Sequence, residues 1–144
     1  MSAAVGRSYP SVTYAVGREK IREFAAATGE TNALHFDLDA ARAAGHGDLV
    51  APPMFAVVYS SPALTAAMLD PELGVDFTRV VHGGQELAWG PLVIAGDEVT
   101  SAATVKDVSE RGGMTFYAFE VTSENQHAAT VCTGTWTIIV RGES

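Results

Sequence analysis

Residues 51–69, with the sequence APPMFAVVYSSPALTAAML, form the longest apolar stretch of the chain and decide how it folds. Pro52 and Pro53 suit the first turn of a helix, where a missing N–H breaks no hydrogen bond of the helix. The helix is expected over about 53–60, and Pro62 is expected to kink it or to restart it. Because this helix leaves little polar surface on any side, we expect a sheet to wrap around it.

The segments before this helix are predicted to be mostly helical. Tyr9–Val16 alternates enough to form a short strand, which Pro10 places at the edge of a sheet. Gly17–Thr28 carries apolar residues on one face, which predicts an amphipathic helix. Asp37 is the expected N-cap of a short helix that continues through Ala44.

After about residue 76 the pattern changes to strands. β-Branched and aromatic residues gather in four runs, with turn residues between them. The predicted strands are Phe77–Trp89, Glu98–Val108, Met114–Ser123 and Ala128–Val140. Gly83 and Gly84 indicate a bulge in the first of them. Helices followed by antiparallel strands predict an α+β fold, and the absence of repeats and linkers predicts a single domain over residues 1–144.

The composition is that of an acidic globular domain. The chain has 144 residues, enough for a substantial core, and 47% of them are hydrophobic, which argues against disorder. The net charge is −8, so phosphate backbones are repelled and we expect no nucleic-acid binding. Arg18, Lys20 and Arg22 are the candidates for a local patch that holds a ligand phosphate.

The chain is expected to be cytoplasmic. Cys132 is the only cysteine, so no internal disulfide can form, and a packed thiol is expected at this position. The first residues lack a basic region followed by an apolar run, so no signal peptide is expected. Pro62 and two serines interrupt residues 51–69, which therefore predict a core helix and no membrane span.

Residues that suit acid–base chemistry lie shortly before the apolar helix, in the stretch GETNALH (residues 29–35). Glu30 and His35 are five residues apart in a predicted loop, so a carboxylate and an imidazole can face one reactive centre. The N-terminus of the following helix supplies partial positive charge for a developing oxyanion. This combination suits the addition or removal of water next to a thioester carbonyl.

The same stretch resembles the GDxNPLH motif of the R-specific enoyl-CoA hydratases and MaoC-like dehydratases. These are hot-dog proteins, in which a curved antiparallel sheet wraps around a central helix. Other stretches are similar to one branch, the FAS1-like (3R)-hydroxyacyl-ACP dehydratase subunits of actinobacterial type. They are VGREKIREF (16–24), LVAPP (49–53), VHGGQE (81–86) and PLVIAGD (91–97). The resemblance covers nearly the whole chain and implies the hot-dog fold.

The resemblance also implies roles for individual residues. In these hydratases the acidic residue and the histidine of the motif do the acid–base work, the asparagine orients them, and a backbone N–H at the start of the central helix binds the thioester carbonyl. The implied catalytic residues are Glu30, His35 and Asn32. The implied substrate-binding residues are Pro53, Met54 and Ser61.

Two of these positions depart from the family pattern. Glu30 replaces an aspartate, and a misplacement of about 1 Å can lower the rate on the order of 100-fold. Pro53 replaces a glycine and has no N–H, although loss of one oxyanion donor typically lowers the rate roughly 100- to 1000-fold. The Met54 N–H replaces this donor only if the acyl group shifts by one residue.

Each candidate also has a structural interpretation. Glu30 can be a solvated acid after a helix, and His35 a loop histidine bonded to the backbone. Asn32 readily bonds its own loop, and a serine on a core helix, such as Ser61, usually bonds back to its own turn. The four histidines lack the spacing of zinc ligands, and His35–Asp39 lacks the glycine and the terminal glutamate of a calcium loop. No metal and no cofactor are expected.

The function expected from these residues and the resemblance is acyl-thioester binding, in a subunit of a (3R)-hydroxyacyl-ACP dehydratase of fatty-acid metabolism. Such a lyase subunit pairs with a catalytic MaoC-like protomer, with the acyl-CoA or acyl-ACP substrate near the interface. One alternative is an autonomous, homodimeric R-specific enoyl-CoA hydratase that uses Glu30 and His35. The others are a non-enzymatic acyl-thioester binder and a thioesterase.

Overall fold

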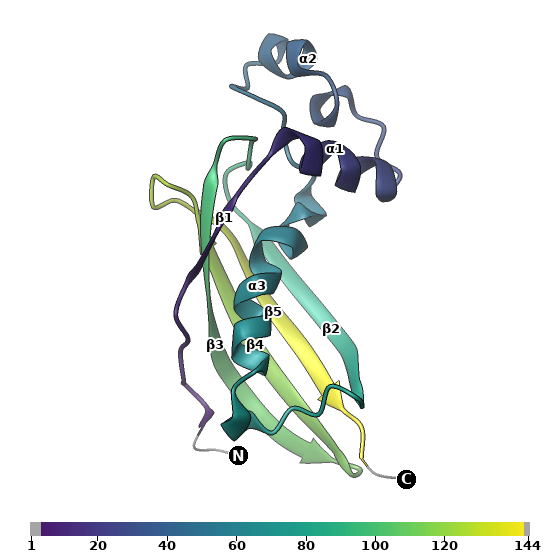
Figure 1. Cartoon of the computed structure of the whole chain (residues 1–144), viewed down its shortest axis with the longest axis vertical. Helices are drawn as coiled ribbons and strands as arrows, with labels where there is room; N and C mark the ends of the chain where they lie inside the picture. Colours follow the sequence, from purple (N-terminus) through teal and green to yellow (C-terminus); the bar gives the residue numbers. More distant parts are fainter. Residues whose placement is uncertain (1–3, 143–144) are drawn as a thin grey trace.

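The computed structural model describes residues 4–142, which form one five-stranded sheet with a long helix packed along it (Figure 1). The predicted α+β hot-dog fold is confirmed. Two shorter helices lie beyond the end of the sheet at which the long helix begins (Figure 1). The strands are β1 (Val12–Ala15), β2 (Val80–Trp89), β3 (Glu98–Arg111), β4 (Met114–Glu124) and β5 (Thr130–Val140). The helices are α1 (Arg18–Ala27), α2 (Leu38–Ala43) and α3 (Ala56–Met68), with short 3₁₀ turns at Ala33–His35, Pro53–Phe55 and Pro71–Leu73.

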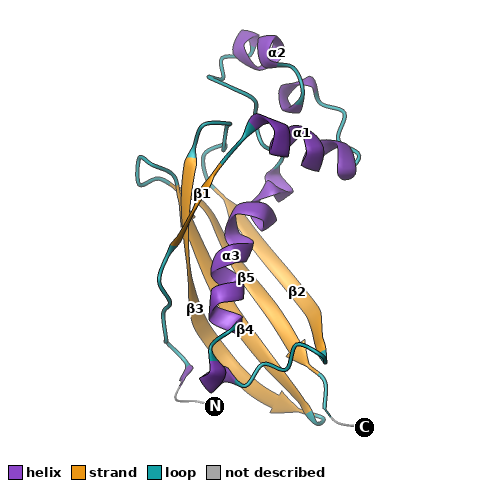
Figure 2. Cartoon of the chain, viewed as in Figure 1, coloured by secondary structure: helices purple, strands orange, loops and turns teal. Residues whose placement is uncertain are grey.

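The sheet is antiparallel throughout, in the order β1-β3-β4-β5-β2. Its strands curve past α3, as Figure 2 shows. The short first strand lies at an edge, as Pro10 predicts, and β2 forms the other edge. The register of β2 against β5 shifts between His82 and Gly84, which confirms the predicted bulge. A Cβ on Gly83 would lie 2.5 Å from the Ile139 Cδ1, so a side chain there would require the Ile139 side chain to shift.

The helix α3 is the centre of the fold, and its course corrects one prediction. It continues from Ala56 to Met68 through Pro62, so the predicted restart at Pro62 does not occur. Burial against the sheet outweighs the roughly 3 kcal/mol that a proline costs inside a helix. Ser60 and Ser61 donate hydroxyl hydrogen bonds to carbonyls one turn back. Within residues 4–142, no helix is long and apolar enough to cross a membrane.

The core has two parts along α3. One surrounds its C-terminal half, where Ala63 and Ala67 let the helix lie close to large side chains of β4 and β5 such as Phe119 and Trp136. The other surrounds its beginning and joins Phe55 to Ile21 of α1. From Cys132 onward alternate residues of β5 are buried, so one face of that strand points into the core.

The N-terminal segment is tied to the other end of α3. The Arg7 Nη1 and the Tyr9 hydroxyl donate to the same Asp70 oxygen, at 2.8 Å and 2.7 Å. Hydrogen bonds from Tyr9 and then Arg7 hold the pKa of the Asp70 carboxyl below its usual range. Burial, and then the bond to Asp70, raise the pKa of Tyr9 to about 12. Asp70 therefore fastens residues before β1 to the turn after α3.

We predict that Asp70→Asn lowers the urea midpoint of unfolding at pH 7. Because the folded pKa of Asp70 is depressed, its stabilisation is present above the ordinary pKa and is lost as the pH falls through the folded pKa. The difference in urea midpoint between Asp70→Asn and the wild type should therefore shrink toward pH 2 to 3, roughly one unit below the ordinary pKa of an aspartate. Glu72→Gln is the matched control, because Glu72 also pairs with Arg7 but its side chain is 70% exposed. An equal loss in both variants, or a difference independent of pH, would contradict the prediction.

Candidate functional site

The loop after α1 holds His35 in a fixed orientation. Asn32 caps the 3₁₀ turn, because its Oδ1 accepts the Leu34 N–H at 3.0 Å. His35 is only 6% exposed, and its Nδ1 lies 2.6 Å from the Val50 carbonyl oxygen. Since a carbonyl can only accept, the hydrogen bond assigns the ring proton to Nδ1 and leaves the Nε2 lone pair free. Asn32 thus has the predicted structural role, and His35 carries one nitrogen able to act as a base.

Val50, whose carbonyl bonds the His35 ring, lies in a segment that is hydrogen-bonded to two other parts of the chain. The Val50 N–H donates to the Leu34 carbonyl at 2.9 Å. The Ala51 N–H donates to the Val93 carbonyl at 2.9 Å, and an isolated bridge joins Val50 to Ile94. Val50 therefore links the His35 loop to the segment that follows β2.

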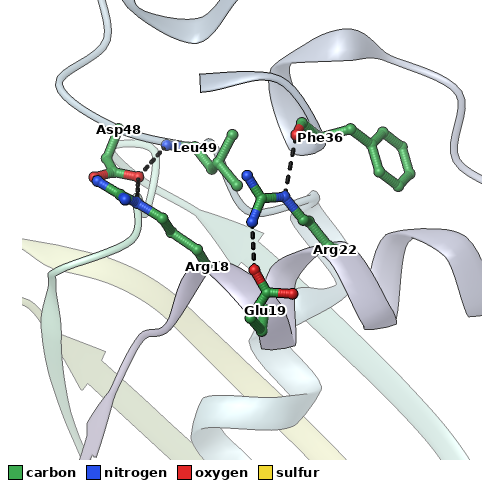
Figure 3. A network of polar contacts seen from close by, with 6 residues as sticks. All are labelled: Arg18, Glu19, Arg22, Phe36, Asp48 and Leu49. Atoms are coloured by element: carbon green, nitrogen blue, oxygen red, sulfur yellow. Dashed lines mark hydrogen bonds and ion pairs between the residues drawn. The ribbon is translucent and has the colours of Figure 1, made fainter. Parts of the chain in front are cut away.

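Two arginines of α1 hold the same region from the other side (Figure 3). The Arg18 guanidinium donates to both Asp48 oxygens, and Asp48 in turn accepts the Leu49 N–H at 2.7 Å. The Arg18 hydrogen bond is the main cause that lowers the pKa of Asp48. The Arg22 Nε donates to the Phe36 carbonyl at 3.1 Å. The residues on both sides of the His35–Val50 contact are thus anchored to one helix.

The three side chains predicted to hold a ligand phosphate, Arg18, Lys20 and Arg22, all form ion pairs within the protein. Each of the three side chains already has a carboxylate partner, so a phosphate would have to compete with an existing ion pair. The pairs are Arg18–Asp48, Lys20–Glu23 and Arg22–Glu19.

Glu30 lies apart from this arrangement. Its N–H closes the end of α1 by donating to the Ala25 carbonyl at 2.9 Å, and its side chain is exposed. Within residues 4–142 the Glu30 carboxylate makes no hydrogen bond, and the structure does not join it to His35. The pairing of these two groups stays a prediction.

A cavity of 380 Å³ opens at the start of α3. Its walls come from the residues before α3, from α3 itself, from the end of β2 and the segment after it, and from β5. The lining residues are Ala51, Pro52, Pro53, Tyr59, Trp89, Gly90, Pro91, Leu92, Val93 and Val131. The lining is apolar, as expected of a pocket for a hydrocarbon chain.

Two side chains of this lining, those of Trp89 and Tyr59, carry polar hydrogens. The Trp89 Nε1 donates to the Pro53 carbonyl oxygen at 2.8 Å. The Tyr59 hydroxyl and the Cys132 thiol are both buried in one core cluster, and burial raises the pKa of both groups. A buried thiol with a raised pKa is a poor nucleophile, which agrees with the packed thiol expected for Cys132. The lining therefore carries two side-chain donors, and one of them, Trp89, already has an acceptor.

The predicted substrate-binding residues are distributed unevenly around this cavity. Pro53 lines it, but supplies a carbonyl and no N–H. Met54 is 45% exposed and is not among the lining residues. Its N–H donates to no group within the described chain. Ser61 bonds the Val57 carbonyl and also lies outside the lining. No sequence pattern pointed to Trp89 or Tyr59, because their place in the cavity depends on where β2 ends relative to α3.

The fold agrees with comparisons to known proteins. The family described as "FAS1-like, dehydratase domain region" matches residues 3–134, and the chain belongs to this family. A UPF0336 protein from Leifsonia xyli subsp. xyli is 45% identical over 142 residues, which cover 98% of this chain and 95% of that protein.

Solved structures agree as well. The C-terminally truncated HadBC (3R-hydroxyacyl-ACP dehydratase) complex from Mycobacterium tuberculosis contains a chain with a TM-score of 0.78 and 28% identity, covering 94% of this chain and 96% of that one. A MaoC-like dehydratase gives a TM-score of 0.84 at 24% identity, covering 98% of this chain and 43% of that one, and this likeness shows the fold alone. Among residues 4–142, no cluster of three or more His, Cys, Asp or Glu side chains could hold a metal ion.

We predict that His35→Ala destabilises the protein by roughly 1–3 kcal/mol, because it removes the donor to a buried carbonyl. No other group within residues 4–142 donates to the Val50 carbonyl, so the acceptor would be left unpaired. Urea unfolding at pH 8 measures the change, and His127→Ala, at an exposed turn, is the control. Nitrogen NMR of the wild type should show a proton on the Nδ1 of His35. A loss of stability no larger than that of His127→Ala, or a proton on the Nε2 of His35 in place of the Nδ1, would contradict this geometry.

Proposed function

We propose that this chain is the acyl-binding subunit of a heteromeric (3R)-hydroxyacyl-thioester dehydratase. The observation that carries the proposal is the apolar cavity at the start of α3, where the Trp89 indole already bonds the Pro53 carbonyl. Such a cavity suits a hydrocarbon chain, because burial of apolar surface needs no hydrogen-bond partner.

The reaction itself needs groups that this cavity lacks. A base must take the proton from C2 of the acyl chain, and an acid must protonate the C3 hydroxyl, which leaves as water as the C2=C3 bond forms. The negative charge that develops on the thioester oxygen requires a hydrogen-bond donor. Pro52 and Pro53 remove two N–H groups from the helix start where the related hydratases place this donor. We therefore assign the chemistry to a catalytic MaoC-like partner.

The edge strand β2 is the surface that we propose for this pairing. It is an open edge of ten residues, and Val81 on it is 38% exposed. An open edge of this length pairs readily with a strand of another chain. The similar HadBC structure, which is a complex, supports this arrangement. In this proposal the acyl-CoA or acyl-ACP lies close to the interface, and the pair works in cytoplasmic fatty-acid metabolism.

A second candidate function is an autonomous hydratase that acts as a homodimer. The observation that favours it is the free Nε2 of His35, which is held by the bond of Nδ1 to Val50 and is able to act as a base. In this candidate Glu30 supplies the acid, and the Met54 N–H takes the place of the missing donor at Pro53.

Hydration of crotonyl-CoA and of a longer enoyl-CoA, followed at the enoyl absorbance, separates these functions. We expect no turnover by the purified chain alone, together with saturable binding of acyl-CoA. Adding a catalytic MaoC-like subunit should produce turnover, and His35→Ala should change that turnover by less than roughly threefold, because the partner supplies the acid and the base.

The other functions give different results in the same assay. Turnover by the chain alone that disappears in His35→Ala, but not in His127→Ala, would establish the autonomous hydratase and overturn the proposal. Saturable binding without turnover, even with the partner, would establish a non-enzymatic binder. Release of free CoA thiol without hydration would establish a thioesterase.

A further inference from the structure

Trp89 bridges the two walls of the cavity with a single hydrogen bond. The indole belongs to the last residue of β2, and its acceptor, the Pro53 carbonyl, belongs to the turn that precedes α3. The two residues are 36 positions apart in the chain, and both line the cavity. Trp89 is also 51% exposed, so its side chain contacts both the cavity and the solvent.

This bond can break without leaving either group unpaired. The Pro53 carbonyl also accepts the Ala56 N–H within the first turn of the helix, and it keeps that donor when the indole moves away. The half-exposed Trp89 N–H can bond to water instead. Since the high cost of a lost hydrogen bond comes from a buried group left unsatisfied, opening this contact is cheap.

The backbone of the same wall is fixed at both ends, so only the side chain is free to move. The Gly90 N–H donates to the Val131 carbonyl at 2.9 Å, and a Cβ on Gly90 would lie 2.2 Å from the Thr130 oxygen. At the far end, Val93 accepts the Ala51 N–H. A rotation of the Trp89 side chain is therefore the smallest movement that separates the two walls.

We infer that Trp89 is the gate of the cavity, closed by its bond to the Pro53 carbonyl and opened by side-chain rotation to admit an apolar acyl chain. The inference rests on the proposed acyl-binding function and adds to it the residue that controls access. The Trp89–Pro53 hydrogen bond closes the gate in the free protein, and it forms again after the acyl chain has bound. Weakening it therefore lowers the barrier to binding and the barrier to release by the same amount.

The test is the effect of Trp89→Phe on binding of decanoyl-CoA, measured by surface plasmon resonance on the immobilised full chain. Phe keeps an aromatic wall but cannot donate to Pro53. Both rate constants, kon and koff, should rise by roughly 2- to 10-fold, the worth of one exposed hydrogen bond, while Kd stays within about twofold. Trp89→Ala also removes the wall and should raise Kd by roughly tenfold or more.

Trp136→Phe is the matched control. It makes the same chemical change, but the Trp136 Nε1 has no partner within residues 4–142 and its ring does not line the cavity. It should leave kon and koff unchanged, and thermal unfolding checks that every variant is folded.

The possible failures are distinguishable. If Trp89→Phe binds decanoyl-CoA with unchanged rate constants, or changes koff alone, the gate is wrong while acyl binding stands. If the wild type does not bind decanoyl-CoA, the acyl-binding proposal fails and the gate fails with it.

Discussion

The burial of α3 is the constraint on which the rest of this structure depends. The helix has no polar face, so it is stable in water only when other elements cover it. The sheet does so by curving around it, and the bulge at Gly83 adds to that curvature in the edge strand. The segment before β1 completes the enclosure, because Asp70 binds both Arg7 and Tyr9 beside the end of the helix. One apolar helix thus explains the layered architecture.

The functional region lies where this enclosure ends, at the beginning of α3. Three consecutive residues there serve different purposes. Leu49 belongs to the core with α1, the Val50 carbonyl fixes the His35 ring, and Ala51 lines the cavity. The imidazole and the apolar cavity are therefore built on one short segment but are separate features, since His35 is not among the lining residues. A chain that binds an acyl group without completing the chemistry is consistent with this separation.

Much of the fold and part of the site could be predicted from the sequence. The cap at Asp37 and the turn held by Asn32 are confirmed, because each depends on hydrogen bonds within a few residues. The interpretation of His35 as a histidine bonded to the backbone is confirmed as well. A restart of the helix at Pro62 was predicted wrongly, because a local preference against proline in a helix is smaller than the burial energy of α3.

The sequence by itself determined which segments are helices and strands, that a sheet must cover residues 51–69, and that Pro53 offers no N–H at the helix start. These properties follow from side-chain periodicity and from the chemistry of single residues, so neighbouring residues suffice to reveal them. Only the tertiary structure decided that Trp89 meets the Pro53 carbonyl, that Tyr59 and Cys132 share one buried cluster, and that Glu30 is exposed while His35 is buried. The reason is that these relations depend on where β2 and β5 end beside α3, and strand register and packing fix those positions over distances that no local pattern records.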